Sequence, residues 1–498
     1  MTKSEQTPNV PAAPEHLRKV LKTRDLVFFS LAANGPLAVV AGALPVAYLV
    51  SGNVGLPLLL VVIAAALALF TIGFAAMSQY IDNAGAFYAY IAAGMGKNAA
   101  VIGAFLVLFC YNTTIIGVYG LVGPTLSNFL AQHLGVHIRW WEASALIWAV
   151  VGVFGIMRIN ISAKVLGIAM IFEVIIVILF NIVGLATTKA QSISATGFNP
   201  HIAFGAGFGV ALVFAFLAFT GFEQPAAYSE EVTKPRQTVA VAMITNLLLI
   251  SLFYGISSWV FGLVAGLDVV VNPAALLKAG YVTAGQPDPT VAFFMIGGRK
   301  IGAIFAELAN ISYMISLFAS ISAFHNVIAR YFMVLGRERV LPPVFGLISK
   351  RYSAPFVGSL VQTVMSMIVV GLFVAYGLDP VLALFTWLPA IGAVSFAIVL
   401  IMASVAVYLF FRQRPEIKIS MPVRLIAPIL AALALICILY LMIKNFNMLV
   451  TGAATPIAPV SIILLALMLL VMVIGFCRGL FLRKYHPEAY RAIGETSV

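Results

Sequence analysis

Two carboxylates lie inside long apolar runs of this sequence. Glu173 occurs in the run IAMIFEVIIVILF, and Glu223 ends the run FAFLAFTGFE. Ionisable side chains are costly in hydrocarbon and are concentrated where membrane proteins bind ions or substrates. A carboxylate in such a place can bind a proton, help to bind a cation, or cap backbone amides that a broken helix leaves free. Both residues are therefore candidates for coupling or gating.

Glycine and proline interrupt two of the apolar runs. Gly221, just before Glu223, predicts local unwinding across Phe219–Glu223. Near the N-terminus, Asn34-Gly35-Pro36 interrupts the first run, because proline removes a backbone donor and disfavours helical geometry at the preceding residue. Discontinuous helices in corresponding positions of two halves are typical of inverted-repeat transporters that bind substrate at the membrane midplane. Taken alone, the break at Gly221 has the alternative interpretation of a glycine-containing helix with Glu223 near the interface, and the break at Gly35 that of a proline-kinked helix.

The substrate is expected between these two breaks. Amides at a half-helix N-terminus favour a carboxylate, and carbonyls at the opposing half-helix end favour an ammonium group. Phe219 or Phe222 is expected to close over the substrate. Two further residues are Asn112 and Trp387, which either line this pocket or belong to the packed core. The candidate binding residues taken directly from the sequence are thus Gly35, Pro36, Asn112, Phe219, Thr220, Gly221, Phe222 and Trp387.

A serine ladder accompanies Glu173 as a candidate coupling site. Ser312, Ser316 and Ser320 recur every four residues, so they share one helix face. Small residues at this spacing serve close helix packing or coordinate a cation or substrate. A charged Glu173 would carry a large desolvation cost. It is therefore expected to bind a proton, or a sodium ion that would keep it ionised; the alternative is a protonated acid that is hydrogen-bonded to a neighbouring helix and has no role in coupling. We expect no other cofactor and no resident metal site.

The composition places the whole chain in the membrane. The 498 residues are 62% hydrophobic and 9% charged, against about 25% charged in average soluble chains. Twelve apolar runs have the length of a membrane span, which predicts an all-α polytopic protein. These spans cover about 26–50, 54–78, 99–130, 142–157, 163–186, 206–229, 238–264, 300–334, 355–376, 380–410, 424–445 and 456–482. The longer loops, 187–204 and 265–299, are expected to contain short surface helices.

Positive charge predicts the orientation of these spans. If the N-terminus is cytoplasmic, 23 of the 29 Lys and Arg residues fall on the cytoplasmic side. The net charge of +12 is therefore interpreted as loop bias, and no nucleic-acid partner is expected. Both termini are predicted to be cytoplasmic, in a multi-pass protein of the inner membrane. The predicted organisation is a tail at 1–22, a ten-helix core at 23–410, two peripheral helices at 411–482 and a tail at 483–498.

Four segments of the chain resemble the amino acid–polyamine–organocation (APC) superfamily of permeases. The most specific is FAFLAFTGFEQPAAYSEEVTKPRQTV, which is similar to the family's sixth helix. The others are NAGAFYAY at 83–90, ISAKV at 161–165 and the stretch from Ala329-Arg330-Tyr331 to GRERVLP at 336–342. The resemblance covers roughly 22–480 and implies a five-plus-five inverted repeat (LeuT-like) fold, with helices 1 and 6 broken.

The resemblance also implies further site residues. Aligned on Pro45, the family's helix 1 substrate segment corresponds to Ala38, Val39, Val40, Ala41 and Gly42, although the family's breaking glycines are absent there. Glu173 falls where several proton-coupled relatives carry a lysine. An acid at the position matching Glu223 is linked to pH sensing in arginine–agmatine exchangers.

The expected function is a secondary transporter that moves an amino acid by alternating access, with proton coupling favoured. A polyamine or other amine permease is the alternative within the class. A membrane enzyme or a substrate sensor is the alternative from another class, but HExxH, GxSxG and GxxxxGK[ST] motifs are absent from the sequence. The three cysteines have no metal-binding or disulfide spacing. The expected partners are a small-molecule substrate and the bilayer, while the oligomeric state stays open.

Overall fold

The computed structural model describes residues 21–81, 87–157, 163–232, 235–282, 288–349, 351–352 and 354–494. The predicted N-terminal tail up to residue 20, and residues 83–86 and 161–162 of the family motifs, lie outside this part. Within it, every regular element is a helix, apart from one isolated bridge between Leu21 and Val232. The predicted all-α polytopic class is confirmed.

Eleven described helical stretches are long and apolar enough to cross a membrane. They are Thr23–Ser51 (α1, η1 and α2), Leu56–Met77 (α3), Lys97–Leu134 (α5), Trp140–Met157 (α6), Gly167–Thr187 (within α7, Ala163–Thr187), Thr238–Ala265 (within α10, Pro235–Ala265), Ala303–Arg337 (α14), Phe356–Ala375 (α15), Pro380–Gln413 (η6 and α16), Pro422–Lys444 (η7 and α17) and Pro459–Tyr485 (α19). The remaining predicted span, 206–229, is divided into α9 (Phe208–Leu217) and η4 (Gln224–Glu231). Neither half alone reaches the length of a span.

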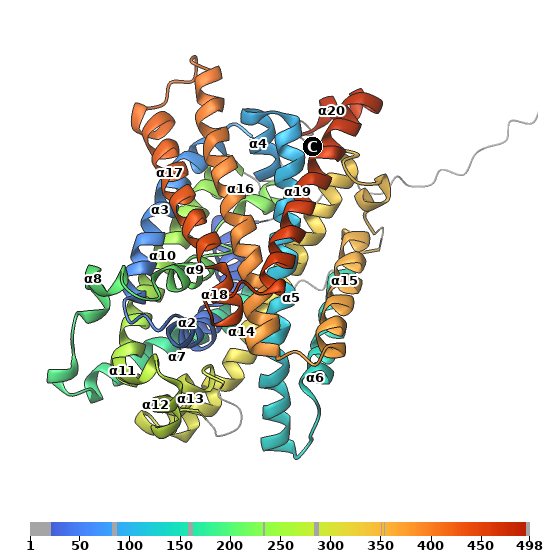
Figure 1. Cartoon of the computed structure of the whole chain (residues 1–498). Helices are drawn as coiled ribbons and strands as arrows, with labels where there is room; N and C mark the ends of the chain where they lie inside the picture. Colours follow the sequence, from blue (N-terminus) through green and yellow to red (C-terminus); the bar gives the residue numbers. More distant parts are fainter. Residues whose placement is uncertain are drawn as a thin grey trace, which may run out of the picture.

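Short helices occupy both ends of the bundle. At one end lie α4 (Phe87–Met95) and α20 (Pro487–Ala492), and toward the other lie α11 (Leu267–Val270), α12 (Pro273–Lys278) and α13 (Val291–Lys300), with α8 (Pro200–Ala203) at the side of the bundle (Figure 1). The last four, with η2 (Ala190–Ser192) and η3 (Thr196–Phe198), fall in the two loops that were predicted to contain short helices. The sequence reasoning missed α4, which connects α3 to α5.

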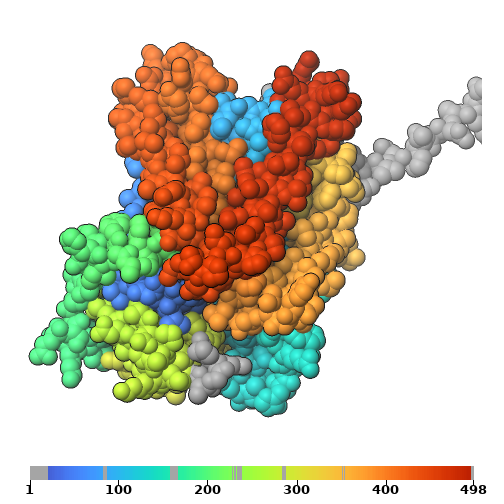
Figure 2. All heavy atoms as spheres, viewed as in Figure 1, coloured from blue at the N-terminus to red at the C-terminus, as the bar shows by residue number. Residues whose placement is uncertain are grey.

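Long helices pack side by side around a buried core. The 38-residue α5 runs along α16 and α19, and α16 also packs against α17 (Figure 1). The C-terminal helices, coloured orange to red, cover much of one face of the molecule (Figure 2). Large apolar side chains such as Leu252, Leu248 and Ile463 are more than half exposed, as expected of helix faces that contact lipid.

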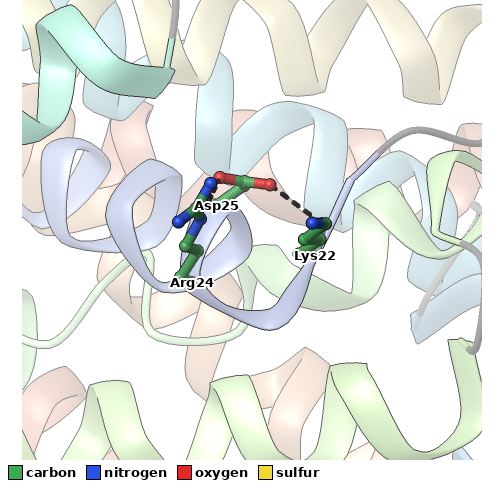
Figure 3. Close-up of polar contacts among 3 residues, drawn as sticks. All are labelled: Lys22, Arg24 and Asp25. Atoms are coloured by element: carbon green, nitrogen blue, oxygen red, sulfur yellow. Dashed lines mark hydrogen bonds and ion pairs between the residues drawn. The ribbon is translucent and has the colours of Figure 1, made fainter.

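The first helix begins with hydrogen-bonded polar residues and ends at a glycine. The backbone N–H of Lys22 donates to Asp25 Oδ2 at 2.9 Å, and Arg24 Nε lies 3.6 Å from Asp25 Oδ1 (Figure 3). An acid in the first turn complements the free amides and the helix dipole there. α1 (Thr23–Asn34) then ends at Gly35, whose φ of 55° favours glycine.

Candidate substrate and coupling site

Helix 1 is broken where the sequence predicted. After Gly35 the chain continues as a wide π-helical turn, η1 (Ala38–Ala43), and then as α2 (Leu44–Ser51). Gly35 also lies against α14, because a Cβ atom there would stand 2.5 Å from Ser320 Oγ. The break therefore needs glycine both for its backbone conformation and for its close approach to α14.

Helix 6 is broken at the predicted glycine. α9 ends at Leu217, a run of turns follows, and Gly221 has a φ of 110° before η4 begins. A Cβ atom on Gly221 would lie 3.1 Å from Asn34 Nδ2. The two breaks are therefore in direct contact, although they are almost 190 residues apart in the sequence.

Asn246 on α10 joins the two breaks. Its Nδ2 donates to Ser30 Oγ, to Asn34 Oδ1 at 3.4 Å and to the Phe222 carbonyl at 3.4 Å. Ser30 Oγ in turn donates to the Gly221 carbonyl at 3.0 Å. The sequence reasoning missed Asn246 and Ser30. The available signal was a lone amide in the apolar run of α10, because polar groups in spans are costly unless they have partners.

A small cavity of about 80 Å³ lies beside the two breaks. Its polar lining is Asn34, Thr114, Thr220 and Ser320. Its apolar lining is Ala33, Ala38, Val39, Ala43, Val118, Leu121, Phe214, Leu217, Ala218, Leu317, Phe324, Phe385 and Pro389. Of the predicted binding residues, Ala38, Val39 and Thr220 are in this set, and so is Ser320 from the predicted coupling group.

The other predicted binding residues of helices 1 and 6 are not among the residues that line the cavity. Gly35, Pro36, Val40, Ala41, Gly42 and Gly221 form the breaks themselves and are buried. Phe219 packs edge-on against Tyr254 at 6.1 Å between ring centroids. Phe222 packs in the same way against Phe70 and Phe396. The aromatic rings that line the cavity are instead Phe214, Phe324 and Phe385.

Asn112 and Trp387 have partners away from the cavity. Asn112 Nδ2 donates to the Leu108 carbonyl of its own helix at 2.7 Å. The indole N–H of Trp387 donates to the Val450 carbonyl at 2.7 Å, and so connects α16 to α18 (Phe446–Thr451). Trp387 thus connects two helices, whereas the Asn112 bond lies within α5 and leaves Asn112 Oδ1 without a hydrogen-bond partner.

Glu173, Ser316 and Ser320 converge on the helix 1 break. Glu173 is 3% exposed, and its Oε2 accepts from Ser316 Oγ at 2.7 Å and from the Leu37 N–H at 3.3 Å. The Ala38 N–H donates to Ser316 Oγ at 3.2 Å, and Ser320 Oγ donates to the Ala32 carbonyl at 3.1 Å. The amides freed at this break are therefore bound by α7 and α14.

Glu223 caps the helix 6 break. It is 1% exposed; its Oε2 accepts from the Gly221 N–H at 3.0 Å, and its Oε1 accepts from the Tyr111 hydroxyl at 2.5 Å. Tyr111 lies on α5 and packs edge-on against Phe324 of α14. Glu223 therefore links the break to α5, and it is not among the residues that line the cavity.

Sequence comparison identifies the family. A family model described as amino acid permease matches residues 26–476. The chain belongs to the amino acid permease family. The predicted resemblance is confirmed, and family membership makes this multi-pass membrane protein a secondary transporter and not an enzyme. No curated protein sequence matches the chain.

Solved transporters share the fold of this permease. Two mutants of a manganese transporter from Eremococcus coleocola each give a TM-score of 0.57 at 13% identity; the first covers 95% of both chains, and the second covers 96% of this chain and 98% of its own. A sodium-coupled sialic acid symporter, solved substrate-bound and outward-open, gives 0.54 at 13% identity, covering 84% of this chain and 89% of its own. At this identity the likeness concerns the fold alone.

Proposed function

We propose that this permease moves an amino acid across the cytoplasmic membrane by alternating access, and that Glu173 carries the coupled proton. The observation that carries the proposal is the contact of Glu173 Oε2 with both the Leu37 amide and Ser316. Through these two bonds one titratable group holds the helix 1 break to α14. Its protonation state therefore acts directly on the element that borders the cavity.

The physical basis is the strength of those two hydrogen bonds. Bonds to a charged acceptor contribute about 1.5–3 kcal/mol, and neutral ones about 0.5–1.5 kcal/mol. An ionised Glu173 holds Leu37 and Ser316 firmly but carries the cost of a buried charge. A proton removes that charge and weakens both bonds, so the helix 1 break is freer to rearrange. Proton binding and movement of helix 1 are thereby coupled.

The test uses Glu173→Gln in proteoliposomes. The variant keeps the size of the side chain and a carbonyl acceptor but cannot ionise. We expect a pH gradient to drive accumulation by the wild-type protein, and the variant to lose accumulation while it retains exchange of internal for external substrate. Glu307→Gln is the matched control, because Glu307 lies on α14 with a half-exposed side chain beside His133. Uptake that requires a sodium gradient and ignores pH would refute the proton assignment and make Glu173 a cation ligand.

A further inference from the structure

The cavity beside the breaks lacks charge. Of the described residues that line it, thirteen are apolar and four are polar but uncharged. The two nearby acids are turned to other partners: Glu173 to Leu37 and Ser316, and Glu223 to Gly221 and Tyr111. A substrate side chain with a charge would therefore enter a site without a counter-charge among these residues.

Two unpartnered polar atoms mark where the substrate's own polar groups can bind. Asn34 Nδ2 and Thr220 Oγ1 are buried without a hydrogen-bond partner, one in each break, and both residues line the cavity. A buried polar atom without a partner costs about 1–3 kcal/mol. Asn34 Nδ2 is a donor and suits a carboxylate oxygen, while the Thr220 hydroxyl can donate to a carboxylate or accept from an ammonium group. A ligand with both groups satisfies both atoms.

The rest of the wall suits a small apolar side chain. Val118 and Leu121 of α5 and Phe214 of α9 line the cavity, together with Phe385 at the end of η6. The volume of about 80 Å³ is far below the roughly 300–1,000 Å³ of pockets for drug-sized ligands. Little room is left for a long side chain.

We propose that the cavity selects zwitterionic amino acids with small, uncharged side chains, and rejects cationic and anionic amino acids and polyamines. This inference rests on the proposed function, because it names the substrate class of the same site. Charge discrimination follows from desolvation, since removing an unpaired ion from water costs several kcal/mol. Size discrimination follows from close packing, in which one methylene group changes the preference about 10–200-fold.

Val118 is the residue we assign to size selection. Val118→Ala enlarges the lined space without adding a polar atom. Val122→Ala is the matched control, because Val122 lies one turn further along α5, is 1% exposed and is not among the cavity-lining residues. We expect Val118→Ala to shift the preference from alanine toward leucine by about tenfold or more, and Val122→Ala to leave the preference unchanged.

The experiment pairs binding with uptake on the full-length protein. Alanine, serine, leucine, arginine, glutamate and putrescine are compared by thermal shift of purified protein and by competition against labelled alanine in proteoliposomes. We expect alanine and serine to compete at least about 100-fold better than arginine, glutamate or putrescine. If a charged compound competes as well as alanine, this inference is overturned while the proposed function of amino acid transport stands. If small neutral amino acids bind but are not transported, the inference stands and the proposed function falls. If no amino acid binds or is transported, both are overturned.

Discussion

Gly221 offers the sharpest test of the broken-helix site. Its φ of 110° is a conformation that other residues adopt only at a cost of about 1–3 kcal/mol. A Cβ atom would also stand 3.1 Å from Asn34 Nδ2 and 3.6 Å from both Ala33 Cβ and Phe324 Cζ. Gly221→Val adds two further methyl groups in this packed region, and such overpacking costs about 1–3 kcal/mol. The sum is about 2–6 kcal/mol.

This cost destabilises the conformation in which the two helix breaks are in contact. A shift of about 5.5 kcal/mol changes a two-state population about 10⁴-fold. For Gly221→Val, the lower end of the estimate therefore corresponds to an about thirtyfold loss of uptake, and the upper end to a complete loss. Gly221→Ala carries mainly the backbone strain, and we expect a loss of about 5–150-fold. Gly255→Ala is the control, since Gly255 lies inside α10 with no atom within 4 Å of an added Cβ. That substitution should leave uptake unchanged, and should leave stability unchanged or raise it slightly.

The assay is the initial rate of uptake into proteoliposomes at matched amounts of incorporated protein, with thermal unfolding measured in parallel. If the Gly221→Val protein fails to insert into the membrane, Gly221→Ala gives the same test with less destabilisation of the fold. Uptake at the wild-type rate by a well-folded Gly221 variant would refute the reasoning and place the substrate path elsewhere.

Four further predictions concern other parts of the molecule. Glu223→Gln keeps only one of the two oxygens that accept hydrogen bonds, so uptake should fall at every pH. The pH profile of uptake should not shift; a shifted profile would show that Glu223 acts as a gating switch. Asn246→Leu leaves the Phe222 carbonyl and Ser30 without their shared donor, at a cost of about 1–3 kcal/mol, so uptake should fall at least about fivefold, and wild-type uptake would contradict the bridging role. Asp288 lies outside the spans, and burial raises the pKa of its carboxyl group. The folded protein therefore binds this proton more tightly than the unfolded chain does, which stabilises the fold at low pH. That stabilisation is lost as the pH rises through the raised pKa. Asp288→Asn should therefore raise the melting temperature at pH 7 and not at pH 4; an equal effect at both would contradict this. A cysteine at Ser194 should react with an impermeant thiol reagent in intact cells and one at Ser497 should not, and the reverse pattern would overturn the predicted orientation.

The sequence alone determined the class of the protein and the places where its helices break. A bilayer about 30 Å thick demands runs of about 20 apolar residues, and these runs are visible in any sequence that has them. The breaks at Gly35 and Gly221 are local events, because they depend on the conformational freedom of single residues and their neighbours. The two carboxylates were equally visible, because ionisable side chains are rare and costly inside apolar runs.

Only the tertiary structure decided which side chains meet at those breaks. A helix that is apolar on every face carries no pattern to orient it about its own axis, so the sequence did not distinguish cavity-facing from lipid-facing positions. For that reason the sequence did not show that Phe219 packs against Tyr254, or that Phe222 packs against Phe70 and Phe396. For the same reason Asn246 was missed, because its partners lie in other helices, as far as 216 residues away along the chain. The charge-free wall of the cavity arises from helices that are distant in sequence, so it exists only once they have packed together.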